Sequence, residues 1–452
     1  MLRHNSGSPG CWQLALRRIF RAQDFYGSIR LIIGLALVLG ITPYYVSRDG
    51  CHGERVVRES WYGFANSISR WLLFAYCYAH IHLHRESLIG YFMRNDISQV
   101  STRLHDVAGI CAAVVIFIMP LFLRRHLRHA IENLVRIDRR LARLHLPVDY
   151  KEVKYQALLV LLLVTALDVS IIIACLVCLA KVDVRPSYQL IFIMIYELIT
   201  ISITICMFCL LARSVQRRLI QLHKVLKNLA HQWDTRSIKA VQKQRSLQCL
   251  DSFSMYTIVT KDPVEIIQES MEIHQLICEA AATANKYFTY QLLTIISIAF
   301  LIIVFDAYYV LETLLGKSKR ESKFKTVEFV TFFSCQMILY LIAIISIVEG
   351  SNRAIKKSEK TGGIVHSLLN KTKSPEVRDK LQQFSMQLMH LKINFTAAGL
   401  FNIDRTLYFT ISGALTTYLI ILLQFTSNSP SNESGNGFDC CEAYHNMTNR
   451  TI

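Results

Sequence analysis

The chain has 452 residues, of which 52% are hydrophobic, and its mean hydropathy is +0.31. This composition excludes an ordinary soluble domain and is typical of a protein that crosses a membrane several times. The formal net charge is +17, but the basic residues lie at the ends of apolar segments, where they orient the spans rather than bind nucleic acid.

The amino-terminal part, residues 1–60, is predicted to be cytoplasmic because residues 1–30 hold five Arg and one Asp. An apolar segment at 31–46 contains two glycines and ends around Pro43. A full span needs about 20 residues, and this segment is shorter. The sequence therefore predicts a short helix before the first span, either membrane-dipping or buried.

Seven longer apolar segments follow and are predicted to cross the membrane as helices. They lie at 61–84, 107–123, 157–181, 188–212, 288–313, 326–349 and 408–426. Three basic stretches lie between some of them, with nine, nine and ten Lys or Arg against four, one and four Asp or Glu, at 124–156, 213–245 and 350–407. An excess of Lys and Arg marks the cytoplasmic side. The sequence thus predicts an all-α membrane protein with seven transmembrane helices, a cytoplasmic N-terminus and an extracellular C-terminus.

These assignments divide the chain into predicted parts. The membrane parts are helices 1 to 4 in 61–212, helices 5 and 6 in 288–349, and a pore-lining helix 7 at 408–426. The cytoplasmic parts are a basic helix at 124–156, a helical segment at 213–287 and anchor helices at 350–407. Their apolar residues recur at steps of three and four. They are interpreted either as a packed bundle that joins subunits or as interfacial helices held against anionic lipid.

The polar tail at 427–452 holds three N-glycosylation acceptors, at Asn432, Asn446 and Asn449. Such acceptors are used on the extracellular side, which agrees with the predicted orientation. Two further acceptor patterns, at Asn370 and Asn394, fall in the predicted cytoplasmic part and are interpreted as chance matches.

Ionisable residues inside membrane spans are costly and mark paired or functional positions. Four such residues are present, Arg70, Asp168, Glu197 and Asp306. Asp168 lies near the middle of its span and is predicted to bond Arg70 as a structural pair. Glu197 and Asp306 lie in the outer halves of their spans.

The second pair of carboxylates has tyrosine neighbours, which are Tyr188, Tyr196, Tyr308 and Tyr309. Aromatic walls with a few converging polar groups describe a small-molecule pocket. Two carboxylates there suit a cationic or polyhydroxylated ligand, so all six residues are candidate ligand-binding residues. The alternative is a structural ion pair, or a belt of tyrosines at the membrane interface.

Neither a catalytic constellation nor a cofactor motif is visible in the sequence, so no enzyme activity and no cofactor are predicted. Two Cys-x-x-Cys pairs, at 175/178 and 206/209, mimic a metal-binding pattern. They lie near opposite ends of consecutive antiparallel spans and should not meet. No metal site is therefore predicted.

The last span has a row of mostly small and polar residues on one helical face. Gly413, Thr417, Ile421 and Gln424 follow one another at steps of three and four. Several copies meeting at an axis would line a narrow pore, with an apolar constriction at Ile421 and an amide ring at Gln424. The alternative is a packing helix in which Gln424 bonds a neighbour.

The same span carries a sequence signature made of Thr417, Tyr418, five apolar residues, Gln424 and Phe425. This signature resembles the closing signature of insect gustatory receptors, and residues 397–415 resemble the lead-in of that family. The resemblance implies a ligand-gated, non-selective cation channel in the plasma membrane of sensory neurons. It also implies a small-molecule tastant as ligand, and assembly as a homotetramer or as a heteromer with other gustatory receptors.

Sugar receptors of that family carry Glu directly after the Thr-Tyr pair, whereas this chain has Leu419. The difference favours a bitter or other non-sugar stimulus. The rival interpretation is a seven-span chemosensor resembling G-protein-coupled receptors, whose termini would be reversed. The Asn-Pro pair of that class's motif is absent from this chain.

Overall fold

The computed structural model describes residues 24–48, 55–92, 96–181, 185–241, 262–316 and 326–428. The described chain is almost entirely helical. Its helices are α2 (Phe25–Val38), α3 (Trp61–His84), α4 (Leu88–Phe92), α5 (Asp96–Ala113), the π-helical turn η1 (Val114–Ile118), α6 (Met119–Arg143), α7 (Tyr150–Lys181), α8 (Tyr188–Val241), α10 (Pro263–Leu314), α11 (Thr326–Lys371), α12 (Pro375–His390) and α13 (Thr406–Asn428).

Two short antiparallel hairpins complete the described fold. Strand β1 (Tyr44–Arg48) pairs with β2 (Arg55–Glu59), and β3 (Thr396–Ala397) pairs with β4 (Phe401–Asn402). Tyr44 fixes the first hairpin to α6, because its hydroxyl donates to the Arg124 carbonyl at 2.9 Å. Burial and the nearby Glu59 carboxylate raise the pKa of Tyr44, so its hydroxyl remains a hydrogen-bond donor.

Six described helices are long and apolar enough to cross a membrane: residues 97–143, 150–181, 188–233, 263–314, 326–371 and 406–425. Helix α3, with 24 residues, is a seventh of sufficient length. The sequence-based prediction of an all-helical protein with seven membrane-length segments is therefore confirmed in its helical class and in six to seven of its helices.

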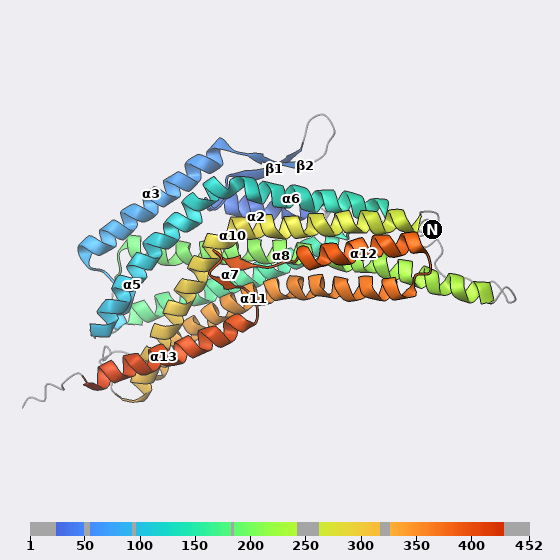
Figure 1. The fold of residues 1–452 in the computed structure, drawn as a ribbon. Helices are drawn as coiled ribbons and strands as arrows, with labels where there is room; N and C mark the ends of the chain where they lie inside the picture. The colour runs from blue at the N-terminus through green and yellow to red at the C-terminus, as the bar shows by residue number, and fades with distance from the viewer. Residues whose placement is uncertain are drawn as a thin grey trace, which may run out of the picture.

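The bundle is elongated, and α8, α10 and α11 run along most of its length (Figure 1). These helices have 54, 52 and 46 residues, and at 1.5 Å per residue α10 extends about 78 Å. Each joins an apolar part to a polar part without a break, and the polar part is basic in α8 and α11 but rich in Glu in α10. Helix α10 lies at the centre, since 61% of its most apolar window is buried.

The short helix predicted within 31–46 lies earlier in the chain, as α2. It begins after Asp24, whose Oδ1 accepts a hydrogen bond from the Gly27 amide at 2.8 Å and caps the helix. It ends before Gly40, which adopts a left-handed φ of 76° that glycine tolerates without a Cβ penalty. Residues 44–48 then form β1, so the predicted boundaries were wrong.

Helix α5, η1 and α6 form one continuous rod, and the π turn has a local cause. Pro120 has no amide hydrogen and its ring displaces the carbonyl of Ile116 four residues earlier. The helix accommodates this mismatch by widening one turn over Val114–Ile118. The π turn lies within the apolar run of the rod, which continues to Leu123 before Arg124.

The polar half of the bundle consists of α6, α12 and the polar parts of α8, α10 and α11. There, a buried ion pair joins four elements. Arg218 of α8 is 1% exposed and its Nη2 donates to Asp138 Oδ2 of α6 at 2.6 Å. Tyr150, at the start of α7, donates to the same oxygen at 2.9 Å. The guanidinium carbon of Arg218 lies 4.6 Å from the ring centroid of Phe25 in α2, a cation–π contact.

We expect Arg218→Met to lower the melting temperature of the detergent-purified protein strongly. The substitution leaves the Asp138 carboxylate buried without its cation, and breaking one side of a buried pair costs about 3–5 kcal/mol. Arg136→Met is the matched control, because Arg136 is an exposed arginine of α6. Equal melting temperatures for the two variants would show that the pair contributes little.

Candidate functional site

A cavity of about 150 Å³ lies among six helices of the membrane region. Residues from α3, α5, α7, α8, α10 and α11 line it, together with the segment around α4. Most of the wall is apolar, including Leu301, Ile302 and Phe305 of α10. The cavity thus has the apolar wall and the small number of polar groups that are typical of small-molecule sites.

Two carboxylates from different helices face this cavity. Glu197 of α8 accepts a hydrogen bond from the Tyr78 hydroxyl of α3 at 3.2 Å. Asp306 of α10 is only 3% exposed, and its Oδ2 has no hydrogen-bond partner among the described residues. Burying an unpaired carboxylate oxygen is costly, so this oxygen favours a donor or cation inside the cavity.

The lining of the cavity includes further polar groups. Ser87 and Thr102 share a hydrogen bond of 2.8 Å between their hydroxyl oxygens. Glu86 and Asp106 add two more carboxylates to the lining, and His105 lies beside Asp106. The charged groups of the cavity are therefore predominantly acidic.

Tyr78 reaches Glu197 because a glycine lies opposite it. A Cβ added to Gly109 of α5 would lie 2.0 Å from the Tyr78 hydroxyl oxygen, far inside van der Waals contact. Sequence reasoning missed Tyr78, Asp106 and Gly109. The only signal was a tyrosine and a glycine inside predicted spans and an acid directly before one of them.

The candidate ligand-binding residues from the sequence occupy different places. Glu197 and Asp306 line the same cavity, as described above. Tyr188 is 89% exposed, and Tyr196 donates to the Leu39 carbonyl at 2.8 Å. Tyr308 and Tyr309 are fully buried in the apolar cluster that adjoins the cavity, and neither lines it. Neighbours on a helix point in directions about 100° apart, so adjacency in sequence did not place these tyrosines in the cavity wall.

The predicted structural pair of Arg70 and Asp168 does not form. Asp168 accepts a hydrogen bond from Ser202 of α8 at 2.9 Å. Arg70 donates to Asn66 at 3.3 Å, and its guanidinium lies 5.4 Å from the Tyr196 ring centroid. The prediction was wrong because α7, which carries Asp168, packs on α8 and α11 rather than on α3.

Helix α13 is the least buried of the six membrane-length helices, with 6% of its most apolar window buried. The four residues that share one face, Gly413, Thr417, Ile421 and Gln424, are all exposed in the single chain. The opposite side packs on the rest of the bundle through Leu419, Leu422 and Leu423. The signature residue Tyr418 makes a ring contact with Phe300 of α10 at 6.0 Å, whereas Phe425 is 68% exposed.

The base of α13 is attached at two points. Arg405 forms a bidentate pair with Glu349 of α11, at 2.8 and 3.1 Å. The β3–β4 hairpin is bonded to α10, where Asn285 Oδ1 accepts from the Thr396 amide at 3.2 Å and Thr289 Oγ1 accepts from the Ala398 amide at 2.7 Å. A membrane helix fixed at its base and exposed along its length suits contact with other subunits.

The model of the 7tm chemosensory receptor family matches residues 29–429. The chain belongs to this family. The receptor is 59% identical over 451 residues to the putative gustatory receptor 28b of Drosophila melanogaster, covering 98% of this chain and 96% of that relative. It is 33% identical over 424 residues to the putative gustatory receptor 28a of the same species, with 90% and 93% covered. The resemblance to insect gustatory receptors is thereby confirmed.

A solved structure with a similar fold is the insect olfactory receptor OR5 from Machilis hrabei in complex with eugenol. The TM-score is 0.57 at 15% identity, and the match covers 89% of the receptor and all of the olfactory receptor chain. The family assignment also confirms that the protein is a multi-pass membrane receptor rather than an enzyme.

We expect Glu197→Gln and Asp306→Asn each to weaken the response of cells expressing the receptor to an activating ligand. The loss of a charged hydrogen bond costs about 1.5–3 kcal/mol, so dose–response curves should move by roughly tenfold or more.

Asp168→Asn is the matched control, because Asp168 is a spanning carboxylate that bonds Ser202 outside the cavity. Its curve should coincide with that of the unchanged receptor at equal surface expression. Unmoved curves for both cavity variants would assign Glu197 and Asp306 a structural role.

Proposed function

We propose that the receptor is a subunit of a ligand-gated, non-selective cation channel that opens when a small molecule binds the cavity beside Glu197 and Asp306. The observation that carries this proposal is α13, a membrane-length helix with an exposed face of small and polar residues. Thr417 donates to the Gly413 carbonyl at 3.0 Å within the helix, and an exposed face that carries Thr417 and Gln424 suits water or another subunit better than lipid alone. The face suits a shared axis in a homotetramer or in a heteromer with other gustatory receptors.

The volume and the lining of the cavity limit the size and the charge of a ligand that could bind there. A volume of about 150 Å³ is enough for a single aromatic ring. The unpartnered oxygen of Asp306 and the carboxylate of Glu197 favour a cationic group or several hydrogen-bond donors on that ligand. We therefore propose a small, non-sugar stimulus of the bitter type, in line with Leu419 in place of the acidic residue of sugar receptors.

A packed route connects the cavity to α13. Leu301 and Phe305 of α10 line the cavity and also belong to the apolar cluster that contains Tyr308 and Phe333. Leu422 of α13 packs against this same cluster. A ligand that binds one arrangement of α10 more tightly would shift the position of α13, which is a population shift between closed and open states.

We expect Ile421→Ala to give current without ligand. A ring of branched side chains at this position excludes water and blocks ions by dewetting, and a smaller side chain lowers that barrier. Leu422→Ala is the control: Leu422 packs into the bundle on the route from the cavity, so its loss should change the response to ligand but give no current without ligand.

Cysteine substitutions at the same positions test the pore directly. Thiol reagents in water should modify cysteines at positions 421 and 424 faster than one at 422. Equal rates at the three positions would contradict a conduction path along α13 and with it the channel proposal.

The proposed receptor lies in the plasma membrane of sensory neurons, with its N-terminus inside and its C-terminus outside. Asn432, Asn446 and Asn449, on which this orientation depends, lie outside the described residues. Glycosidase should increase the electrophoretic mobility of the full-length protein, and changing the three residues to Gln should abolish that effect. An effect that persists in the triple variant would place Asn370 or Asn394 outside the cell and reverse this part of the topology.

A further inference from the structure

A second cavity, of about 300 Å³, lies between α7, α8 and α11 and shares no lining residue with the ligand cavity. Its lining includes three arginines, Arg213 and Arg217 of α8 and Arg353 of α11, and one carboxylate, Glu349. Apolar side chains, including Val160 and Ile345, also line it. A lining that combines several cations with apolar side chains suits an anion that carries an apolar portion.

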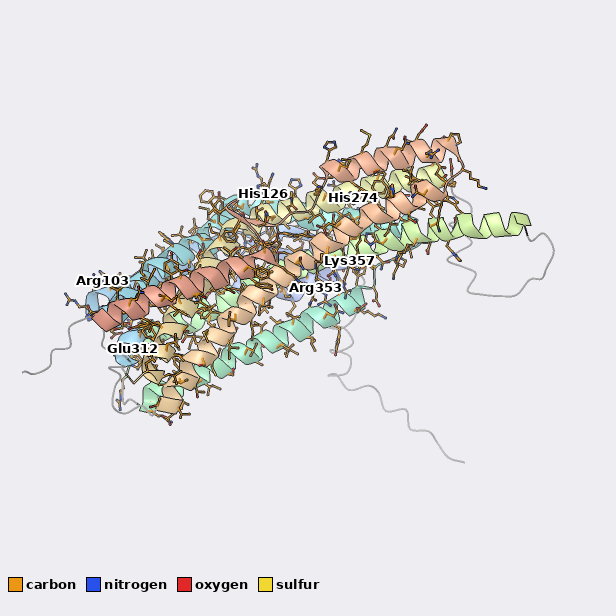
Figure 2. All side chains as sticks on the ribbon, turned by 60° about the horizontal axis from the view of Figure 1, so that its bottom comes forward. Arg103, His126, His274, Glu312, Arg353 and Lys357 are labelled. Carbon is orange, nitrogen blue, oxygen red and sulfur yellow. The ribbon has the colours of Figure 1, made fainter. Side chains whose placement is uncertain are left out.

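The cavity lies where the apolar parts of its helices end. On α8 the apolar run ends at Ala212 and Arg213 follows it directly. On α11 the apolar segment ends before Glu349, and Arg353 follows one turn later. Figure 2 shows Arg353 near the middle of the elongated molecule. In a membrane protein, this transition from apolar to basic sequence marks the level of the lipid head groups.

The three arginines are not balanced by carboxylates. Arg217 Nη2 lies 3.1 Å from Glu152 Oε1 and also bonds the side-chain oxygen of Gln156. Arg353 Nε lies 3.8 Å from Glu349 Oε2. That carboxylate is already held at both oxygens by Arg405. Two carboxylates therefore serve four arginines, which leaves an excess of positive charge around the cavity.

Arg213 is the clearest source of this excess. Among the described residues it forms no ion pair within 4.0 Å and no side-chain hydrogen bond, and the charges that act on it are Arg217, Arg353 and Glu152. Two of these three charges repel it. A polyvalent anion in the cavity would relieve this repulsion and would receive charge-assisted hydrogen bonds from planar guanidinium groups, whose geometry matches phosphate oxygens.

We propose that this cavity binds a phosphate ester through Arg213, Arg217 and Arg353. A phosphorylated lipid head group and a soluble phosphate ester share this chemistry. The proposed site is separate from the ligand cavity, and its occupancy requires neither channel opening nor a tastant.

The test is the melting temperature of the full-length, detergent-purified receptor, followed by its intrinsic tryptophan fluorescence. Dioctanoyl phosphatidylinositol bisphosphate should raise the melting temperature in a saturable way, since a ligand that binds only the folded state stabilises it. Dioctanoyl phosphatidylcholine, whose head group is zwitterionic, should not. Inositol trisphosphate and inorganic phosphate separate the two sources: a shift with the lipid alone identifies a head-group site, and an equal shift with the soluble anions identifies a phosphate-ester site open to water.

Substitutions locate the site. Arg353→Gln, at a mostly exposed position, should weaken the apparent affinity about tenfold or more, and Arg213→Gln should do the same. Glu152→Gln should strengthen it, because it releases Arg217 from its competing carboxylate. Arg136→Gln, at an exposed position of α6 outside the cavity, should match the unchanged receptor. The proposal is overturned if none of the phosphates shifts the melting temperature, or if Arg136→Gln weakens the shift as much as the cavity variants do.

Discussion

The buried pair of Arg218 and Asp138 is the interaction on which the polar half of the bundle depends. Two charges removed from water cost several kcal/mol each unless their geometry is good. Here the guanidinium donates to Asp138, to the Leu134 carbonyl at 3.3 Å and to the Ser214 carbonyl at 2.9 Å. The bonds to Asp138 and Leu134 join α8 to α6, whereas the bond to Ser214 lies within α8. Because the first two bonds are directional, they favour one register of α6 against α8.

A fixed register in the polar half determines what the membrane half can do. Helices α8, α10 and α11 pass through both halves without a break. The position of their membrane parts therefore depends on how their polar parts are packed. Helix α13 is attached to α11 by Arg405 and to α10 by the β3–β4 hairpin. It is otherwise the most exposed of the six described membrane-length helices. The long helices therefore contribute most of the packing that stabilises the fold, whereas α13 has few contacts that would prevent it from moving or from contacting other subunits.

Hydropathy and charge predicted most of the helical layout, because the membrane requires long apolar helices and basic ends. The closing signature identified the family from about 10 residues. The sequence did not reveal the pair of Arg218 and Asp138. Both residues lie in strongly basic stretches, where charged side chains ordinarily face water, and only the packing of α6 on α8 buries them. The same limit applied to Tyr78 and Asp106, since the lining of a cavity is set by contacts between distant helices.

The predicted pairing of Arg70 with Asp168 failed for a related reason. An intramembrane charge needs a partner, but a neutral donor can satisfy a carboxylate, and Ser202 does so for Asp168 at 2.9 Å. Asp306 differs from Asp168 in having an oxygen that no described residue satisfies. Glu86, which also lines the cavity, has such an oxygen as well. Unsatisfied carboxylate oxygens beside a cavity cost free energy, and a ligand that supplies the missing donors recovers that cost on binding. Because α10 carries Asp306 and also packs on α13, the free energy gained there acts on the helix that the pore proposal requires to move.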